Sequence, residues 1–106
     1  MGIFDLFRGI NINEALDGYR NDKNAVLLDV RTREEYADGR IPGSINLSLQ
    51  QIDKIKKVAP DKKRSIYVYC LSGARSRQAK RYLERIGYIN VVDLGGFAGY
   101  KGKVER

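Results

Sequence analysis

The one cysteine of this 106-residue chain lies in the stretch CLSGARS, at positions 70–76. The apolar run SIYVY precedes it, and the helical pattern RQAKRYLERIG follows it. If Cys70 ends a strand and a helix begins near Arg75 or Ser76, the positive end of the helix dipole and a guanidinium both lie near the sulfur. Both favour the thiolate, which is the nucleophilic form of cysteine. The spacing therefore predicts a reactive cysteine at a strand end.

The segment between Cys70 and this helix is short and contains Gly73, which can adopt a positive φ angle without steric cost. Successive N–H groups of such a loop can turn inward and form an anion-binding nest. The competing interpretation is that Cys70 is a small buried hydrophobic residue, as free cysteines often are. The strand end, the glycine and the arginine together favour the chemical role.

The elements that must position this loop can be predicted from the apolar periodicity. Strand-like runs cover 25–30, 44–47, 65–70 and 90–94, and the last of them leads into Gly95 and Gly96. Helical patterns cover 12–19, 32–39, 49–59 and about 75–86, and the second begins with the capping-box spacing of Thr32 and Glu35. Strands that alternate with helices predict an α/β fold, with a mostly parallel central sheet flanked by helices in three layers. In such a sheet, ligands bind beyond the carboxyl ends of the strands.

Composition limits the class of protein. Hydrophobic residues make up 42% and charged residues 31%, as in globular proteins, and the length predicts a single domain over residues 1–106. The formal net charge is +7, but the basic residues are dispersed without interleaved aromatic side chains, so we expect no nucleic-acid partner. One cysteine and no histidine cannot build a transition-metal site of the usual kind, so neither a metal nor another cofactor is expected.

The same features predict a location. A single cysteine cannot form an internal disulfide, which suits a reducing compartment. No apolar run is long enough to span a membrane, and the opening MGIFDLFRG lacks the basic region of a secretory signal. We therefore expect a cytoplasmic protein without a membrane partner.

Three segments in order extend the pattern around the cysteine. CLSGAR follows the form Cys-x-x-Gly-x-Arg, LLDVRTREEYADGRIPGSINL lies upstream of it, and VVDLGGFAGYKG lies downstream. Together they resemble the single-domain rhodanese-like sulfurtransferases over nearly the whole chain. The resemblance implies the rhodanese-like fold, which is a three-layer α/β domain.

The resemblance also implies a reaction. Cys70 would take sulfane sulfur from a small donor such as thiosulfate, a polysulfide or a persulfide, and would become a persulfide itself. It would then pass the sulfur to cyanide or a thiol, and a protein is a further possible donor or acceptor. The substrate-binding residues are then those of the loop, namely Leu71, Ser72, Gly73, Ala74 and Arg75.

Other matched positions are expected to support the loop. Asp29 and Arg31 would lie near it, and we favour a strand-end ion pair for them, for instance between Arg31 and Glu35. Gly95 and Gly96 match the family's glycine pair, which close backbone packing explains. One departure bears on the substrate: Leu71 stands where thiosulfate-using members often carry an arginine, so a cation that would hold the sulfonate is missing.

Two alternatives remain open. Phosphatases and arsenate reductases also combine a cysteine with an arginine in an anion-binding loop, but their loops are one residue longer than the four residues between Cys70 and Arg75. The shorter loop favours a single sulfur atom over a phosphoryl group. The second alternative is a persulfide carrier without turnover, or a rhodanese-like module that binds a protein, and the retained Cys70 and Arg75 favour catalysis over it.

Overall fold

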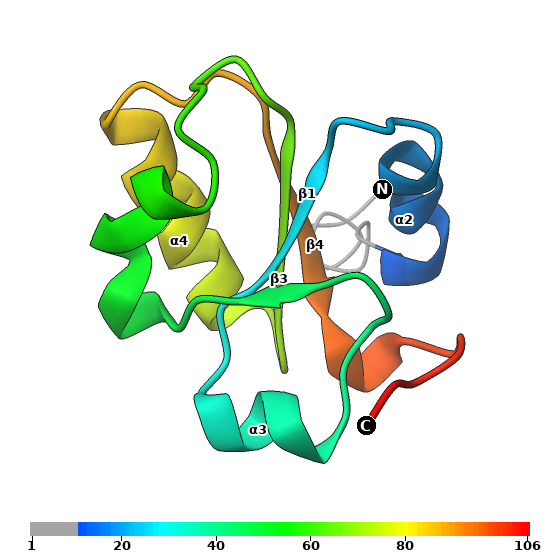
Figure 1. Cartoon of the computed structure of the whole chain (residues 1–106). Helices are drawn as coiled ribbons and strands as arrows, with labels where there is room; N and C mark the ends of the chain where they lie inside the picture. Colours follow the sequence, from blue (N-terminus) through cyan, green and yellow to red (C-terminus); the bar gives the residue numbers. More distant parts are fainter. Residues whose placement is uncertain (1–10) are drawn as a thin grey trace, which may run out of the picture.

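A computed structural model describes residues 11–106 and contains a parallel sheet with helices on both faces (Figure 1). The stretch MGIFDLFRG, which was considered as a signal segment, lies outside the described residues. The strands of this sheet are β1 (Val26–Asp29), β2 (Ile45–Asn46), β3 (Ile66–Cys70) and β4 (Val91–Gly96). They are ordered β2-β1-β3-β4, and each pair of neighbours runs parallel. The α/β prediction is confirmed, and β4 continues through the glycine pair.

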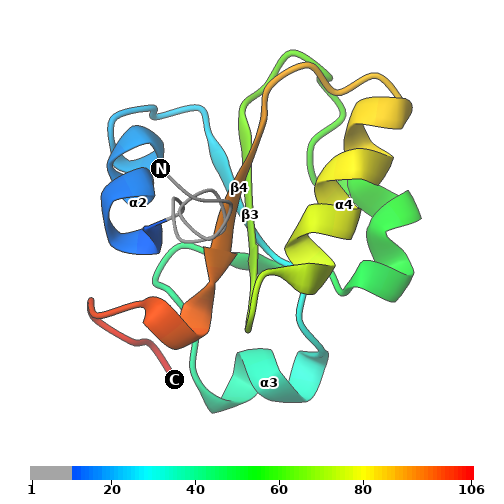
Figure 2. The same cartoon turned by 180° about the vertical axis from the view of Figure 1, so that it is seen from behind.

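The helices form two layers around the sheet (Figures 1 and 2). On one face lie α4 (Ala74–Arg85) and η1 (Leu49–Lys57), a 3-10 helix where the sequence predicted a helix of unspecified type. On the other face lies α2 (Ile12–Arg20), while α3 (Arg33–Asp38) lies beyond the end of the sheet. The short η2 (Phe97–Gly99) follows β4 directly. No helix within residues 11–106 is long and apolar enough to cross a membrane.

Alternation along β3 divides the core between the two faces. Ile66, Val68 and Cys70 belong to the apolar cluster beneath α4 and η1, whereas Tyr69 belongs to the cluster beneath α2. Successive side chains of a strand point to opposite faces, so this division follows from the strand period of two. As the last residue of β3, Cys70 therefore has its side chain on the α4 side of the sheet.

The capping box predicted for α3 is present. The side chain of Thr32 accepts a hydrogen bond from the Glu35 N–H at 3.2 Å, and the Glu35 carboxylate accepts one from the Thr32 N–H at 3.0 Å. Two N–H groups without intrahelical partners are satisfied in this way. The cap fixes the start of α3 close after the end of β1, at the same edge of the sheet as Cys70.

Gly96 lets β4 lie directly against the loop that follows Cys70. A Cβ atom at this position would lie 2.5 Å from the carbonyl oxygen of Leu71 and 3.1 Å from the Cα of Ser72. Both neighbours are backbone atoms, so no side chain can move aside to make room. The expectation that close backbone packing explains Gly96 is confirmed.

We therefore predict that Gly96→Ala destabilises the protein by about 1–3 kcal/mol, the usual cost of overpacking. The added methyl group must displace either β4 or the cysteine loop, so the alkylation rate of Cys70 should change as well. Urea unfolding and iodoacetamide kinetics measure the two effects. Gly99→Ala is the matched control, because a Cβ atom there meets no atom within 4 Å. Equal stability of the two variants would contradict this account of the loop.

Candidate active site

The sulfur of Cys70 is held by the first turn of α4. Its side chain is fully buried, and Sγ accepts hydrogen bonds from the backbone N–H of Gly73 at 3.0 Å and of Ser76 at 3.3 Å. The thiol also lies 3.5 Å from Ser76 Oγ, and that hydroxyl donates to the carbonyl of Gly73 at 3.1 Å. The N-cap of α4 is Gly73, which has no side chain, so the cysteine sulfur supplies the acceptor that a helix start requires.

Three of the predicted loop residues, Leu71 to Gly73, form the turn between β3 and α4, and the other two, Ala74 and Arg75, begin α4. Gly73 has a φ angle of +104°, in the left-handed region that favours glycine. Leu71, Ser72 and Ala74 are exposed around the buried sulfur, and 43% of Leu71 is accessible. Ala74 and Arg75 are the first residues of α4, and the first amides of a helix have no partner within it. The loop thus places N–H groups close to the sulfur and an apolar side chain beside it.

Arg75 pairs with Glu35, which joins the start of α4 to α3. The guanidinium donates to the two carboxylate oxygens at 2.6 and 3.0 Å, and about a third of each side chain is exposed. Hydrogen bonds from Arg75, helped by those from Thr32, lower the pKa of Glu35 to about 2 despite the opposing effect of burial. The same pairing raises the pKa of Arg75. The positive charge expected to favour the thiolate is therefore largely balanced by a carboxylate.

Asp29 and Arg31 form a separate, buried ion pair at the end of β1. Arg31 Nη2 donates to Asp29 Oδ2 at 2.7 Å and to the carbonyl of Gly39 at 2.7 Å, and Nε lies 3.1 Å from both carboxylate oxygens. Burial disfavours the charged guanidinium, but the hydrogen bonds to Asp29 outweigh this effect and raise the pKa of Arg31. A strand-end ion pair was expected, but its suggested partner, Glu35, is wrong, because Glu35 binds Thr32 and Arg75 instead.

Arg31 reaches the cysteine loop through η2. Its guanidinium carbon lies 4.5 Å from the centroid of the Phe97 ring, within the range of a cation–π contact. The next residue, Ala98, donates its N–H to the carbonyl of Leu71 at 3.1 Å. The buried ion pair therefore contacts, through Phe97, the segment that binds the start of the loop.

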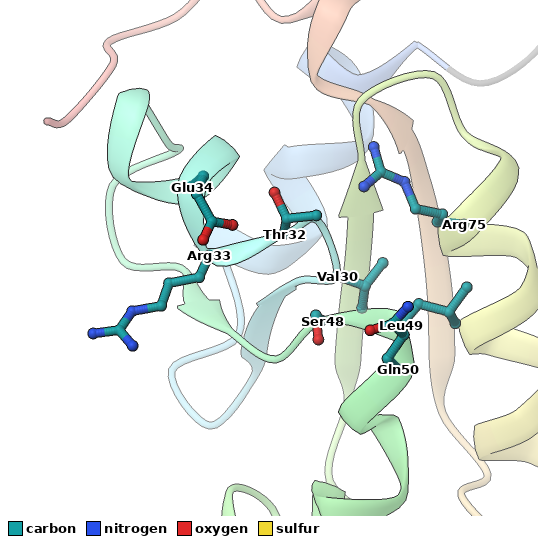
Figure 3. A pocket seen from close by; sticks show the side chains of 8 residues that line it. All are labelled: Val30, Thr32, Arg33, Glu34, Ser48, Leu49, Gln50 and Arg75. Carbon is teal, nitrogen blue, oxygen red and sulfur yellow. The ribbon is translucent and has the colours of Figure 1, made fainter.

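A pocket of about 320 Å³ adjoins the loop at Arg75. Figure 3 shows Arg75 extending from the start of α4, with the start of α3 and the start of η1 facing it. The lining residues combine polar and apolar side chains: Val30, Thr32, Arg33, Glu34, Ser48, Leu49, Gln50 and Arg75. Cys70 does not line this pocket. The pocket therefore lies beside the sulfur site, and Arg75 is the residue that the two have in common.

Sequence reasoning missed two partners of the site. Ser76 is fully buried and contacts the sulfur, and a signal for it exists, because it continues the buried stripe of Ala79 and Leu83 one turn backward. Glu35 was assigned to the capping box and, wrongly, to an ion pair with Arg31. Its second role, the ion pair with Arg75, joins residues 40 positions apart and has no local signal.

Comparison with known proteins identifies the family. A family model described as a rhodanese-like domain matches residues 12–103. The chain belongs to the rhodanese-like domain family. A solved structure described as a rhodanese with anions from E. coli superimposes with a TM-score of 0.73 at 32% identity, covering 77% of this chain and 98% of that one. The rhodanese-like fold predicted from the three ordered segments is therefore confirmed.

Curated relatives of this rhodanese-like chain are named for sulfur transfer. Thiosulfate sulfurtransferase PspE of Escherichia coli is 39% identical over 70 residues, which cover 65% of this chain and 67% of the relative. A sulfurtransferase of Allochromatium vinosum is 40% identical over 74 residues, which cover 70% and 68%. A putative sulfur carrier protein, YrkF of Bacillus subtilis, is 33% identical over 86 residues, or 80% of this chain and 46% of that protein. The chain is thus a member of the rhodanese-like sulfurtransferase family, which includes named enzymes and a named carrier.

The Glu35–Arg75 pair predicts a specific pH dependence of stability. Because the pKa of Glu35 falls from its ordinary 4.5 to about 2 in the folded protein, the unfolded chain takes up the proton first as the solution is acidified. The stabilisation is complete above about pH 4.5 and is lost as the pH falls toward 2. The Glu35→Gln variant should therefore lose less unfolding free energy than the wild type as the pH falls through this range, while glutamine still serves the capping box.

Urea unfolding of both proteins from neutral pH to about pH 2 measures this difference. Glu34→Gln is the matched control, because it removes an exposed charge from the same helical turn without touching Arg75. The control should keep the wild-type slope of unfolding free energy against pH. If Glu35→Gln keeps that slope too, the ion pair contributes no measurable stability.

Proposed function

We propose that this protein is a sulfurtransferase that carries sulfane sulfur as a persulfide on Cys70. The observation that carries the proposal is the pair of backbone N–H groups, from Gly73 and Ser76, that donate to Sγ at the start of α4. Such donors favour an anionic sulfur, whether it is the attacking thiolate or the terminal sulfur of a persulfide. Relatives named as sulfurtransferases support the same reaction class.

The reaction takes place in two displacements on sulfur. With thiosulfate, the Cys70 thiolate attacks the outer sulfur, the S–S bond of thiosulfate breaks, and sulfite leaves with the bonding electrons. In the second step cyanide attacks the outer sulfur of the persulfide, the new S–S bond breaks, and thiocyanate leaves while the Cys70 thiolate returns. A thiol acceptor reacts in the same way and becomes a persulfide. Neither step consumes an oxidant or a reductant, so the proposal includes no cofactor and no metal.

The loop residues receive roles from their positions. The persulfide adds one sulfur at an S–S distance of about 2.05 Å beyond Sγ, and we assign its binding to the amides of the Leu71–Arg75 segment. Asp29 and Arg31 act as positioning residues through Phe97. The sequence contains no second cysteine to resolve the persulfide, so the acceptor must be an external nucleophile. We also propose a reducing, cytoplasmic setting, in which a lone thiol stays free.

The first test of the proposal is the fate of one sulfur atom. Incubation with thiosulfate or polysulfide should increase the intact mass of the protein by one sulfur, and added cyanide should remove that sulfur as thiocyanate. Cys70→Ser should abolish both the mass increase and the thiocyanate, because a hydroxyl cannot form the persulfide. Sulfur retained by the Cys70→Ser variant would refute the proposal. A persulfide that forms without repeated thiocyanate release would indicate the non-turnover carrier instead.

The second test concerns Leu71 and the charge of the donor. Thiosulfate presents a sulfonate, which an arginine can bind by charge-assisted hydrogen bonds and a leucine cannot. Hydrogen bonds to charged groups contribute about 1.5–3 kcal/mol, or roughly ten- to a hundredfold in affinity. We expect weak use of thiosulfate with a high KM, and a preference for less charged donors such as polysulfides.

Leu71→Arg should therefore lower the KM for thiosulfate by roughly tenfold or more, and should change the KM for an uncharged organic polysulfide much less. Steady-state formation of thiocyanate measures both constants. Leu71→Gln is the control, because it adds a polar group of similar length without a charge. An unchanged thiosulfate KM in the arginine variant would show that the sulfonate is bound elsewhere.

A further inference from the structure

The solvent-facing side of α4 forms a basic stripe that begins at the cysteine loop. Ala74, Arg77, Arg81 and Arg85 are all exposed and follow one another at helical spacing along this face, and Glu84 is the one acidic residue of the helix. Figures 1 and 2 show α4 beginning close to the end of β3 and running back along the sheet. The stripe therefore starts next to the exposed Leu71 and continues away from the site along one continuous face.

The helix dipole favours Arg85 in the last turn of α4, but it does not explain Arg81. Arg81 and Arg85 are four residues apart, and like charges at this spacing destabilise a helix. The first turn of α4 has no acidic residue, although acidic side chains there favour a helix, and both α2 and α3 have them. Lys80, Arg81 and Arg85 make no ion pair with any residue in 11–106. No ion pair within the described residues therefore uses these three charges.

The neighbouring η1 enlarges the basic surface. Its last turn contains the basic residues Lys54, Lys56 and Lys57, all of them exposed, and η1 packs against α4. The two elements lie side by side on the same face of the sheet in both views (Figures 1 and 2). The basic face of α4 and η1 is thus wider than a single helix.

The length of the stripe indicates the size of its ligand. Arg85 lies eleven positions after Ala74, and at about 1.5 Å per residue this corresponds to roughly 16 Å. Neither cyanide nor a small thiol can reach Arg85 while it reacts at Cys70. A macromolecule can contact both places at once. The exposed Leu71, 43% accessible beside the sulfur, suits the apolar centre of a protein interface.

We propose that the basic face of α4 and η1 docks an acidic protein, and that a cysteine thiol of this protein receives the sulfur from Cys70. The inference rests on the proposed function. The acceptor thiolate attacks the outer sulfur of the Cys70 persulfide, the S–S bond breaks, and Cys70 leaves as a thiolate while the acceptor becomes a persulfide. Electrons and atoms balance without any further reagent.

The experiment compares synthetic acceptors that differ only in charge. The full-length protein is loaded with sulfur and then offered a cysteine peptide with several glutamates, the same peptide with glutamine at each of those positions, or cyanide. Mass spectrometry follows the transferred sulfur. At low ionic strength the acidic peptide should react roughly tenfold faster than the neutral one, and added salt should reduce the difference.

The decisive variant carries Arg81→Glu and Arg85→Glu. It should lose the preference for the acidic peptide and keep the rate with cyanide, because neither residue contacts the sulfur. Its thermal stability should be equal to or slightly lower than that of the wild type, because two glutamates four residues apart repel each other as the arginines do and a negative charge in the last turn opposes the helix dipole. Lys23→Glu with Lys63→Glu is the matched control: both lysines are exposed and precede β1 and β3, at the sheet edge opposite Cys70. This control should keep the preference.

Three results would overturn the inference. If both double variants lose the preference for the acidic peptide equally, net charge acts without a docking face. If the wild type reacts with both peptides at equal rates, no acidic acceptor is selected. Binding of a single-stranded RNA that depends on Arg81 and Arg85, without a preference between the peptides, would assign the face to nucleic acid. If cyanide releases no thiocyanate from the loaded wild-type protein, the proposed sulfur transfer itself is refuted. The cyanide reaction therefore distinguishes failure of the proposed function from failure of the docking inference.

Discussion

The site depends on the hydrogen bonds between the Cys70 sulfur and the first turn of α4. Most helices satisfy their first N–H groups with a serine, threonine, asparagine or aspartate at the N-cap. Here the sharp turn after β3 requires a positive φ angle, and glycine meets that requirement without steric cost but brings no side chain. The sulfur three residues earlier takes over the capping role, with contacts of 3.0 and 3.3 Å. The contacts that start the helix are therefore the same contacts that hold the sulfur to which we assign the transfer reaction.

The loop is held from three further directions, which explains how so short a segment can be precise. Gly96 allows β4 to lie against its backbone, and the Ala98 amide binds the Leu71 carbonyl. Beneath this contact, Phe97 lies against Arg31, whose charge is buried and paired; removing one partner of such a pair costs about 3–5 kcal/mol. On the remaining side, Arg75 ties the start of α4 to α3. The sheet, the helices and η2 all converge on the turn after Cys70.

Local rules predicted the parts of this arrangement that are local. The strands, the α3 capping box and the turn at Gly73 each follow from a few neighbouring residues, whereas the packing role of Gly96 was expected from the family resemblance. The ion pairs could not be predicted in this way, because a carboxylate can accept several donors and only the fold decides which are near. Glu35 Oε1 accepts from the Thr32 N–H and from the guanidinium of a residue 40 positions away. Arg31 pairs with Asp29, which lies only two residues before it.

The distribution of positive charge links the donor preference to the proposed docking face. Near the sulfur, the loop presents the uncharged Leu71, and the charge of Arg75 is balanced by Glu35. Farther away, the outer face of α4 concentrates cations, whose field extends about 8–10 Å at moderate ionic strength. A small dianion carries its charge next to its reacting sulfur and so meets the part of the site with the least positive charge. In an acidic protein the negative charge lies apart from the reacting group. Its thiol can enter beside Leu71 while carboxylates on the protein surface lie along α4. The same charge pattern therefore supports both proposals, the weak use of thiosulfate and the protein acceptor.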